Sequence, residues 1–273
     1  MSFVDANVAD LDRSVDFYRG LFDLPSPGIS EDTGGRRRAE LSAGPAVLRL
    51  TEVGPDGAAG DWITDDLQKG FRHIGFKVSD LDARADRVRA AGVPFHLEPT
   101  DAVGGVRIAF FQDPDGLMLE FIQGTLTYHK VWSERLRSAE RDMPVPDTPR
   151  FDHVAVTVQD LDRALRFYWE TLGFDVIGQL FHEQDPRGFV ITYLRAGDTV
   201  LELFTYDAAK SGPSRPGDDE FGFSTIGFDT DEGEASAARL KEAGAQSSAT
   251  AFDRSWQRFL DPDGIPLTLR TAR

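Results

Sequence analysis

A unit of one strand, one helix and further strands recurs along this chain, and an internal repeat constrains a fold more than any single motif. The clearest sign is an Asp-Leu-Asp triplet, which occurs at residues 10–12, 80–82 and 160–162. A fourth, looser copy is marked by Ile226-Gly-Phe228, which matches Ile74-Gly-Phe76. The sequence therefore predicts four copies of one supersecondary unit.

The third copy shows the pattern most fully. Three valines alternate with other residues over 154–158, and they follow His153, as in a strand with two different faces. Asp160 stands where its carboxylate can cap a helix, an apolar stripe follows, and Gly173 is placed to end that helix. If the valines face the helix, His153 faces the opposite side of the sheet.

Each unit is expected to be βαβββ, and alone it would leave an open sheet with bare edges. We therefore predict an α+β fold: four βαβββ modules paired into two curved, barrel-like mixed sheets with helices outside. We expect one domain at 1–124 (units one and two), a charged, proline-rich linker at 125–149, and a second domain at 150–273 (units three and four). Units could pair as sequence neighbours, or unit two with three and one with four.

Composition excludes some classes of function. The net charge of −16 argues against a nucleic-acid partner, because phosphate binding needs a basic surface. No apolar run has the length of a membrane span, so we expect no membrane partner and a cytoplasmic location. The chain has no cysteine, so a metal would have to be held by His and carboxylates. We expect a monomer or homodimer with a small-molecule substrate.

Several motifs together resemble the vicinal oxygen chelate superfamily, which includes glyoxalase I, extradiol dioxygenases, methylmalonyl-CoA epimerase and bleomycin-resistance proteins. The matching motifs are Phe17-Tyr18, Phe167-Tyr168, Leu172-Gly173-Phe174, the strands that begin at His73 and His153, and the Asp-Pro-Asp-Gly turns at 113–116 and 261–264. The resemblance covers nearly the whole chain apart from the linker. It supports the fold and says little about the reaction, because one fold hosts many chemistries.

The resemblance implies metal ligands on the first and last strands of a unit. Unit two has His73 and Glu120 at these positions, and unit three has His153 and Glu202. Units one and four have neither type of ligand, since the corresponding residues are Phe3, Arg49, Thr225 and Thr268. A single strand histidine is more often a hydrogen-bonded core residue, but two His–Glu pairs at similar spacing favour a metal.

The pairing of units decides whether these ligands meet. Pairing between sequence neighbours would give two half-sites with one His and one Glu each. Crossed pairing would bring His73, Glu120, His153 and Glu202 to a single centre and leave the other cavity without metal ligands. We prefer crossed pairing because it leaves one complete site.

A two-His, two-Glu set resembles that of glyoxalase I. It implies one divalent ion (Zn, Ni, Mn, Co or Fe) and a glyoxalase-like isomerase or lyase that acts on a substrate with vicinal oxygens through an enediolate-type intermediate. Glu120 or Glu202 would then be the catalytic residue that carries the proton.

Two alternatives remain open at this point. One is an Fe(II) extradiol-type dioxygenase, which needs only three protein ligands. The other is a metal-free binding or drug-resistance protein with an aromatic pocket, which Phe3, Phe110, Phe204, Phe223 and Trp256 could line. Arg49 could hold a carboxylate or phosphate ligand in the second cavity, or pair with a neighbouring acid.

Overall fold

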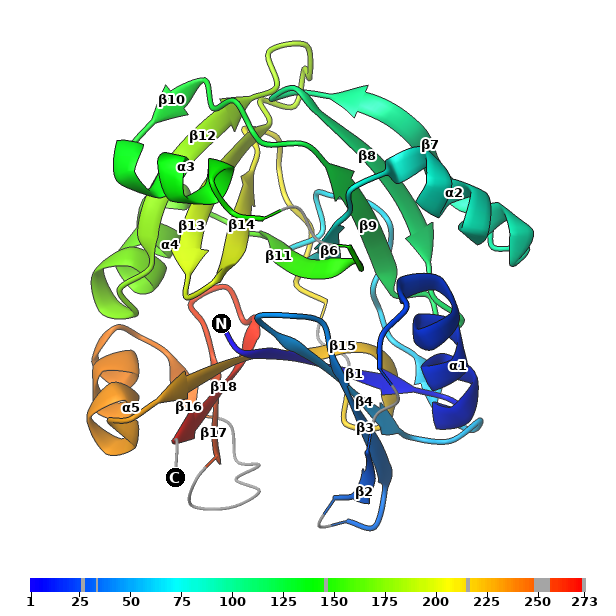
Figure 1. Ribbon diagram of the computed structural model, residues 1–273. Helices are drawn as coiled ribbons and strands as arrows, with labels where there is room; N and C mark the ends of the chain where they lie inside the picture. Colours follow the sequence, from blue (N-terminus) through cyan, green and yellow to red (C-terminus); the bar gives the residue numbers. More distant parts are fainter. Residues whose placement is uncertain (26–27, 33, 145–146, 215–216, 248–255, 272–273) are drawn as a thin grey trace.

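Two mixed β-sheets lie back to back, and their concave faces point away from each other (Figure 1). The structure is a computed structural model that describes residues 1–25, 28–32, 34–144, 147–214, 217–247 and 256–271. Units one and four form one sheet, here called the outer-unit sheet, and units two and three form the inner-unit sheet. Both sheets are open rather than closed into barrels.

The outer-unit sheet has the strand order β16-β17-β18-β15-β1-β4-β3-β2, with β5 beside β15. Its strands are β1 (Phe3–Val8), β2 (Ile29–Glu31), β3 (Arg37–Ser42), β4 (Val47–Glu52), β5 (Ala58–Ala59), β15 (Glu220–Thr230), β16 (Gln246–Ser247), β17 (Trp256–Leu260) and β18 (Pro266–Thr271).

The inner-unit sheet has the order β10-β12-β13-β14-β11-β6-β9-β8-β7. Its strands are β6 (Gly70–Lys77), β7 (Phe95–Ala102), β8 (Val106–Gln112), β9 (Met118–Gln123), β10 (Lys130–Val131), β11 (Arg150–Thr157), β12 (Asp175–Phe181), β13 (Val190–Ala196) and β14 (Thr199–Thr205).

The preferred crossed pairing is confirmed. The first strands of units two and three, β6 and β11, pair antiparallel, and so do β1 and β15 of units one and four. Within each unit the first and last strands pair in parallel, as β6 does with β9 and β11 with β14. The predicted α+β fold of four βαβββ modules in two curved sheets is therefore correct, and the first and last strands of two units meet at the centre of each sheet.

The helices are α1 (Leu11–Phe22), α2 (Leu81–Ala90), α3 (Glu134–Arg141), α4 (Leu161–Leu165) and α5 (Gly233–Glu242), and α4 continues as the π-helix η1 (Arg166–Thr171). The predicted caps are present: Asp10, Asp80 and Asp160 each accept a hydrogen bond from the backbone N–H three residues later. Helices α1 and α2 on one side and α4 and α5 on the other flank the gap between the sheets (Figure 1), where the convex faces share one large apolar core. The π-helix was not predicted.

Contacts between sequence neighbours cross from one sheet to the other. Tyr18 on α1 donates a hydrogen bond to Asp113 in the turn of unit two, and Tyr168 donates one to Asp261 in the turn of unit four. Residues 125–149 contribute α3 and the short strand β10, which pairs with β12. The domain boundaries at 124 and 150 stay a prediction.

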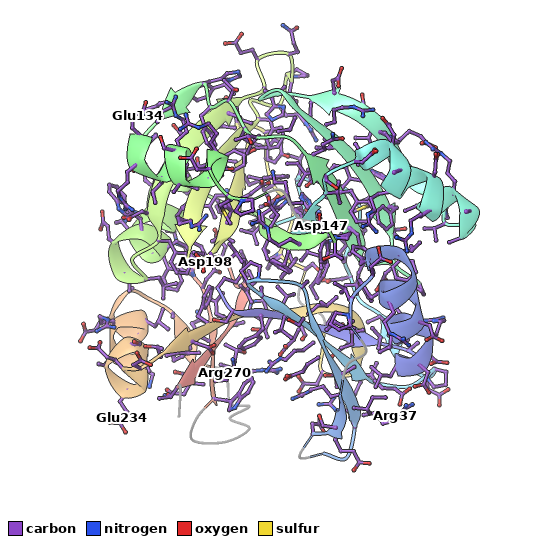
Figure 2. All side chains as sticks on the ribbon, in the orientation of Figure 1. Arg37, Glu134, Asp147, Asp198, Glu234 and Arg270 are labelled. Atoms are coloured by element: carbon purple, nitrogen blue, oxygen red, sulfur yellow. The ribbon has the colours of Figure 1, made fainter. Side chains whose placement is uncertain are left out.

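Charged side chains extend from the rim of the molecule, as Arg37 on β3, Glu134 on α3 and Glu234 on α5 illustrate (Figure 2). In the part of the chain that the structure describes, every helix is too short or too polar to cross a membrane.

Candidate metal centre

Three potential metal ligands meet at the centre of the inner-unit sheet: His73 on β6, Glu120 on β9 and His153 on β11. The two Nε2 atoms are 3.1 Å apart, and Glu120 Oε2 lies 3.0 Å from His73 Nε2 and 2.8 Å from His153 Nε2. All three side chains are buried. This cluster could bind a metal ion, because imidazole nitrogens and a carboxylate oxygen converge on one small volume.

Strand register brings these groups together. In the antiparallel β6–β11 pair, Gly75 lies opposite His153, and in the parallel β6–β9 pair Gly75 lies beside Glu120. Because Gly75 has no side chain, the imidazole of His153 lies across the backbone of β6. A Cβ at position 75 would stand 2.0 Å from the His153 ring, so this close approach requires glycine there.

Glu202, the fourth predicted ligand, lies on the other side of His153. Its Oε1 is 3.6 Å from His153 Nδ1, whereas Glu120 faces Nε2. Glu202 comes from β14, is buried, and lines the same cavity as His73 and Glu120. All four predicted residues thus reach one region of one sheet, three with their ligand atoms in near contact. Their assignment as metal ligands stays a prediction.

Asp152 is a neighbour that the sequence reasoning missed. Its Oδ2 lies 3.1 Å from His153 Nδ1, so its carboxylate can fix the tautomer and orientation of that ring. A residue next to His153 on a regular strand would face the other side of the sheet, but the register of β11 shifts between Phe151 and His153. This bulge brings Asp152 to the histidine's side, and nothing in the sequence marks the bulge.

The electrostatics of the cluster follow from burial and mutual contact. Burial alone would raise the pKa of Glu120, but His153 and His73 lower it to about 2. Burial would lower the pKa of His153, but Glu202, Glu120 and Asp152 raise it well above its usual value. The pKa of Glu202 is raised to about 8, mainly by burial, against the attraction of His153. The two glutamates therefore differ: Glu120 is held ionised, and Glu202 binds a proton more readily.

A cavity of about 310 Å³ opens beside the cluster. Its wall is largely apolar and aromatic, with a few polar groups, as in small-molecule sites. Of the aromatic residues proposed from the sequence, Phe110 and Phe204 line it. His96 and His182 also line it, although they lie outside the ligand positions of their units and the sequence indicated only surface or packing roles for them.

The equivalent place in the outer-unit sheet has a different composition. Thr225 and Thr268 are hydrogen-bonded to each other, with 3.0 Å between their hydroxyl oxygens. Arg49 is paired with the neighbouring acid Asp5 through two hydrogen bonds of 2.5 Å each. Its guanidinium carbon is 3.7 Å from the ring centre of Phe3 and 4.3 Å from that of Trp256.

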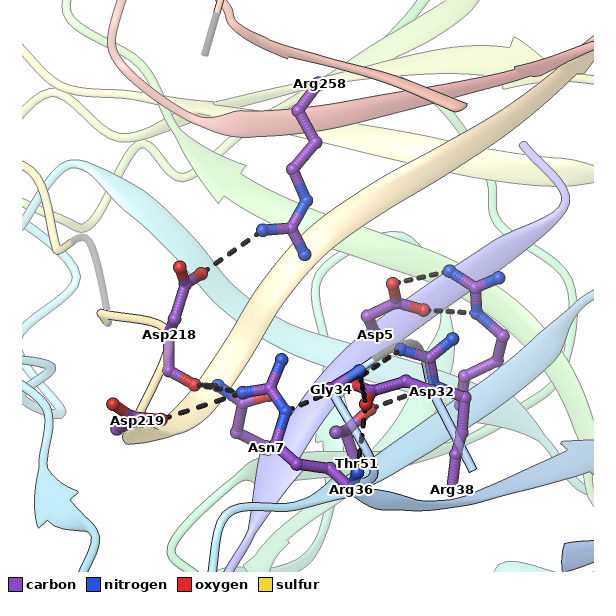
Figure 3. Close-up of polar contacts among 11 residues, drawn as sticks. Asp5, Asn7, Asp32, Gly34, Arg36, Arg38, Thr51, Asp218, Asp219 and Arg258 are labelled. Atoms are coloured by element: carbon purple, nitrogen blue, oxygen red, sulfur yellow. Dashed lines mark hydrogen bonds and ion pairs between the residues drawn. The ribbon is translucent and has the colours of Figure 1, made fainter. Parts of the chain in front are cut away.

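Asp5, which accepts these two hydrogen bonds, is labelled in Figure 3 together with three further arginines that make polar contacts nearby. Arg36 bonds to Asp32, Arg38 bonds to Thr51, and Arg258 pairs with Asp218. Among the described residues, the inner-unit cluster is the one group of His and acidic side chains arranged to hold a metal.

Comparison with known proteins identifies the family. The model of the Glyoxalase/Bleomycin resistance protein/Dioxygenase superfamily matches residues 1–121 and 150–269. The two matched stretches correspond to the two sequence halves on either side of the segment that contains α3.

Relatives in this family carry lyase names. The chain is 27% identical over 281 residues to the lactoylglutathione lyase GLX1 of Arabidopsis thaliana. The aligned region covers 94% of this chain and 86% of the relative. It is 36% identical over 124 residues to a probable lactoylglutathione lyase of Vibrio cholerae, covering 42% of this chain and 84% of the relative.

A solved structure agrees with these relatives. Glyoxalase I from Zea mays superposes with a TM-score of 0.74 at 25% identity, over 99% of this chain and 92% of the maize chain. The relatives and this structure support an enzyme of lyase type.

Proposed function

We propose that this chain, which belongs to the Glyoxalase/Bleomycin resistance protein/Dioxygenase superfamily, is a metal-dependent lyase of the glyoxalase I type. The observation that carries the proposal is the buried convergence of His73 Nε2, His153 Nε2 and Glu120 Oε2 within 3.1 Å of one another beside a cavity. Similarity to lactoylglutathione lyases supports the reaction class.

The donor set fits a divalent cation such as Zn, Ni, Mn, Co or Fe. His73, His153 and Glu120 would hold the ion, and Glu202 would complete the set by turning from the Nδ1 side of His153. Such an ion would act as a Lewis acid on two adjacent substrate oxygens and make the neighbouring C–H more acidic.

The chain's own residues would then move the proton. Glu202 suits this role because it lines the cavity and stands apart from the three converging ligand atoms. Glu120 suits a fixed role, since the two imidazoles lower the pKa of its carboxyl to about 2. In this assignment Glu202 takes a proton from one substrate carbon and returns it to the next. The aromatic wall of the cavity keeps bulk water away.

We propose lactoylglutathione as the substrate or product, from the names of the relatives. The reaction joins or separates glutathione and a three-carbon dicarbonyl fragment, with an internal transfer of one hydrogen. A small molecule of this kind requires neither nucleic acid nor a membrane, and the chain would act as a monomer or homodimer in the cytoplasm.

The test is a thioester assay with methylglyoxal and glutathione, on protein loaded in turn with Zn, Ni, Mn, Co and Fe(II). We expect thioester formation with at least one metal and its loss in Glu120→Gln. A stoichiometric metal content without thioester formation under any metal would refute the lyase assignment while leaving the metal centre standing.

A second function has one observation in its favour. Three ligand atoms, two from imidazole and one from carboxylate, are already in near contact, while Glu202 lies apart. Two His and one carboxylate with open positions are typical of Fe(II) oxygenases. Oxygen uptake with catechol that requires Fe(II) and persists in Glu202→Gln would establish this alternative over the lyase.

A further inference from the structure

A second cavity lies at the other end of the inner-unit sheet and has no role in the proposed reaction. It has a volume of about 200 Å³ and is here called the rear cavity. Three cationic side chains from three strands line it: Lys77 on β6, Arg150 on β11 and Arg195 on β13. Three acids, Glu140, Asp152 and Asp198, line it as well, so what the cations can offer a ligand depends on how these acids are paired.

Arg150 is the least satisfied of the three cations. Among the described residues its Nε is buried without a hydrogen-bond acceptor, and its ion pair with Asp152 is long, 3.8 Å between Nη2 and Oδ1. The side chain is only 17% exposed, so water reaches little of it. A buried charged donor without an acceptor is unfavourable, so Arg150 is held at a cost in this position.

Each of the three acids around the rear cavity already has a hydrogen-bond or ion-pair partner. Asp152 bonds to His153, Glu140 accepts a hydrogen bond of 2.6 Å from the Tyr128 hydroxyl, and Asp198 pairs with Arg195 at 3.2 Å. Lys77 gives one hydrogen bond to the carbonyl of Gly124 and lies 4.0 Å from Asp152. Burial raises the pKa of Glu140. The cations therefore keep donors that no acid in the cavity occupies fully.

We propose that the rear cavity binds a small oxyanion, a carboxylate or a phosphate, through Arg150 with Lys77 and Arg195. The planar guanidinium of Arg150 can donate two parallel hydrogen bonds to either group. Lys77 adds a point charge from the neighbouring strand. Arg195, whose side chain is 18% exposed, pairs with the exposed Asp198, which is labelled in Figure 2.

The site is distinct from the metal centre but touches it through one residue. Asp152 lines the rear cavity and also contacts His153 Nδ1, so an anion there would lie on the far side of Asp152 from the imidazole. The proposal does not depend on the reaction at the metal centre, and anion binding alone tests it.

The experiment is calorimetric titration of the protein with inorganic phosphate and, separately, with malonate, at fixed ionic strength. We expect saturable binding of at least one of them, and the tighter ligand identifies the source of the oxyanion. Arg150→Gln should weaken that binding by at least about tenfold, because hydrogen bonds to a charged group are lost. The matched control is Arg137→Gln on α3, outside the cavity, which should bind as the parent does.

Further variants keep the test decisive if Arg150→Gln does not fold. Arg150→Lys retains the charge without the planar fork, and Arg195→Gln removes one of the other two cations, so both should bind more weakly than the parent. The proposal is overturned if neither anion binds, or if binding is equal in the parent and all three cavity variants. It is also overturned if binding is lost in Glu120→Gln but kept in Arg150→Gln, since the anion would then sit at the metal centre.

Discussion

The two sheets share one architecture, but the side chains at their centres differ in type. In the inner-unit sheet the ring of His153 lies over Gly75, and in the outer-unit sheet the ring of Phe3 lies over Gly227 in the same way. Beside His153 are a second imidazole and a carboxylate. Beside Phe3 are two threonines and a guanidinium already neutralised by Asp5.

The difference shows two ways of stabilising a buried carboxylate at the centre of such a sheet. Asp5 lies beside Arg49 on neighbouring strands at the positions that Ala155 and Glu202 have in the other sheet. The outer-unit sheet thus carries its own cation on a side chain. The inner-unit sheet instead offers imidazole and carboxylate ligands, which an ion from solution can use. Side chains at a few positions, rather than the fold, decide which of the two occurs.

The largest expected effect is at Glu120. Glu120→Gln should remove the metal and reduce turnover by about 10³-fold or more, because the ligand set loses its charged member. The equivalent change in the other sheet, Thr268→Gln, should leave metal content and activity unchanged. Elemental analysis and turnover of both variants give the measurement, and equal losses in both would contradict the contrast between the sheets.

Next comes the buried ion pair of the outer-unit sheet. Arg49→Met leaves Asp5 buried and unpaired, so we expect a loss of about 3–5 kcal/mol in the free energy of unfolding. The double change Asp5→Leu with Arg49→Met should recover most of that loss, since a well-packed apolar pair avoids burying any charge. Urea unfolding measures both variants. Metal affinity should not change in either, and a parallel loss of metal would mean that the two centres are coupled.

A smaller effect is expected from the support of His153. Asp152→Asn should weaken metal affinity by about 10–100-fold, because an outer carboxylate orients the imidazole and raises its basicity. Asp198→Asn is the matched control: it also lines the rear cavity but does not contact a histidine. Competition with a metal chelator measures the affinity. If both variants bind the metal like the parent, Asp152 has no positioning role.

The smallest effect concerns the two equivalent turns. Burial raises the pKa of Asp113 to about 7 and that of Asp261 to about 6, whereas an unfolded aspartate has a pKa of about 3.9. The folded state binds these protons more tightly, so their contribution to stability is complete below the unfolded pKa and is lost as the pH rises through the folded pKa.

Between pH 6 and 7 the free energy of unfolding of the parent should fall, and Asp113 accounts for about 1 kcal/mol of that fall. Asp113→Asn should abolish this contribution, whereas Asp261→Asn should keep most of the fall. Chemical denaturation at closely spaced pH values measures the difference. If the two variants show the same dependence of stability on pH, the carboxyl groups of the two turns do not differ in pKa as expected.

Much of this arrangement was predictable because it follows from repetition. The caps at Asp10, Asp80 and Asp160 fixed three helix starts, and the His–Glu pairs indicated which two units had to meet. What escaped prediction depends on local irregularity. Two such irregularities are the bulge that brings Asp152 to His153 and the continuation of α4 as the π-helix η1. Both change which way a side chain points without changing the pattern of residue types.

The aromatic residues show the same limit. Phe204 and Phe110 line the cavity, whereas Phe3 and Trp256 stack on Arg49 and Phe223 stacks on Phe71. Period-two alternation places all of them on a face, but it cannot say which of two concave faces holds a ligand cavity.

Because Gly75 has no side chain, it leaves the space in which the His153 ring reaches the other ligands. An alanine there would displace the His153 ring by its methyl group alone, while every ligating residue kept its chemical identity. A chain altered in this way would carry the full set of donors and still be unable to assemble them. Assembly of the centre therefore depends on the space left at position 75 as well as on the ligands themselves.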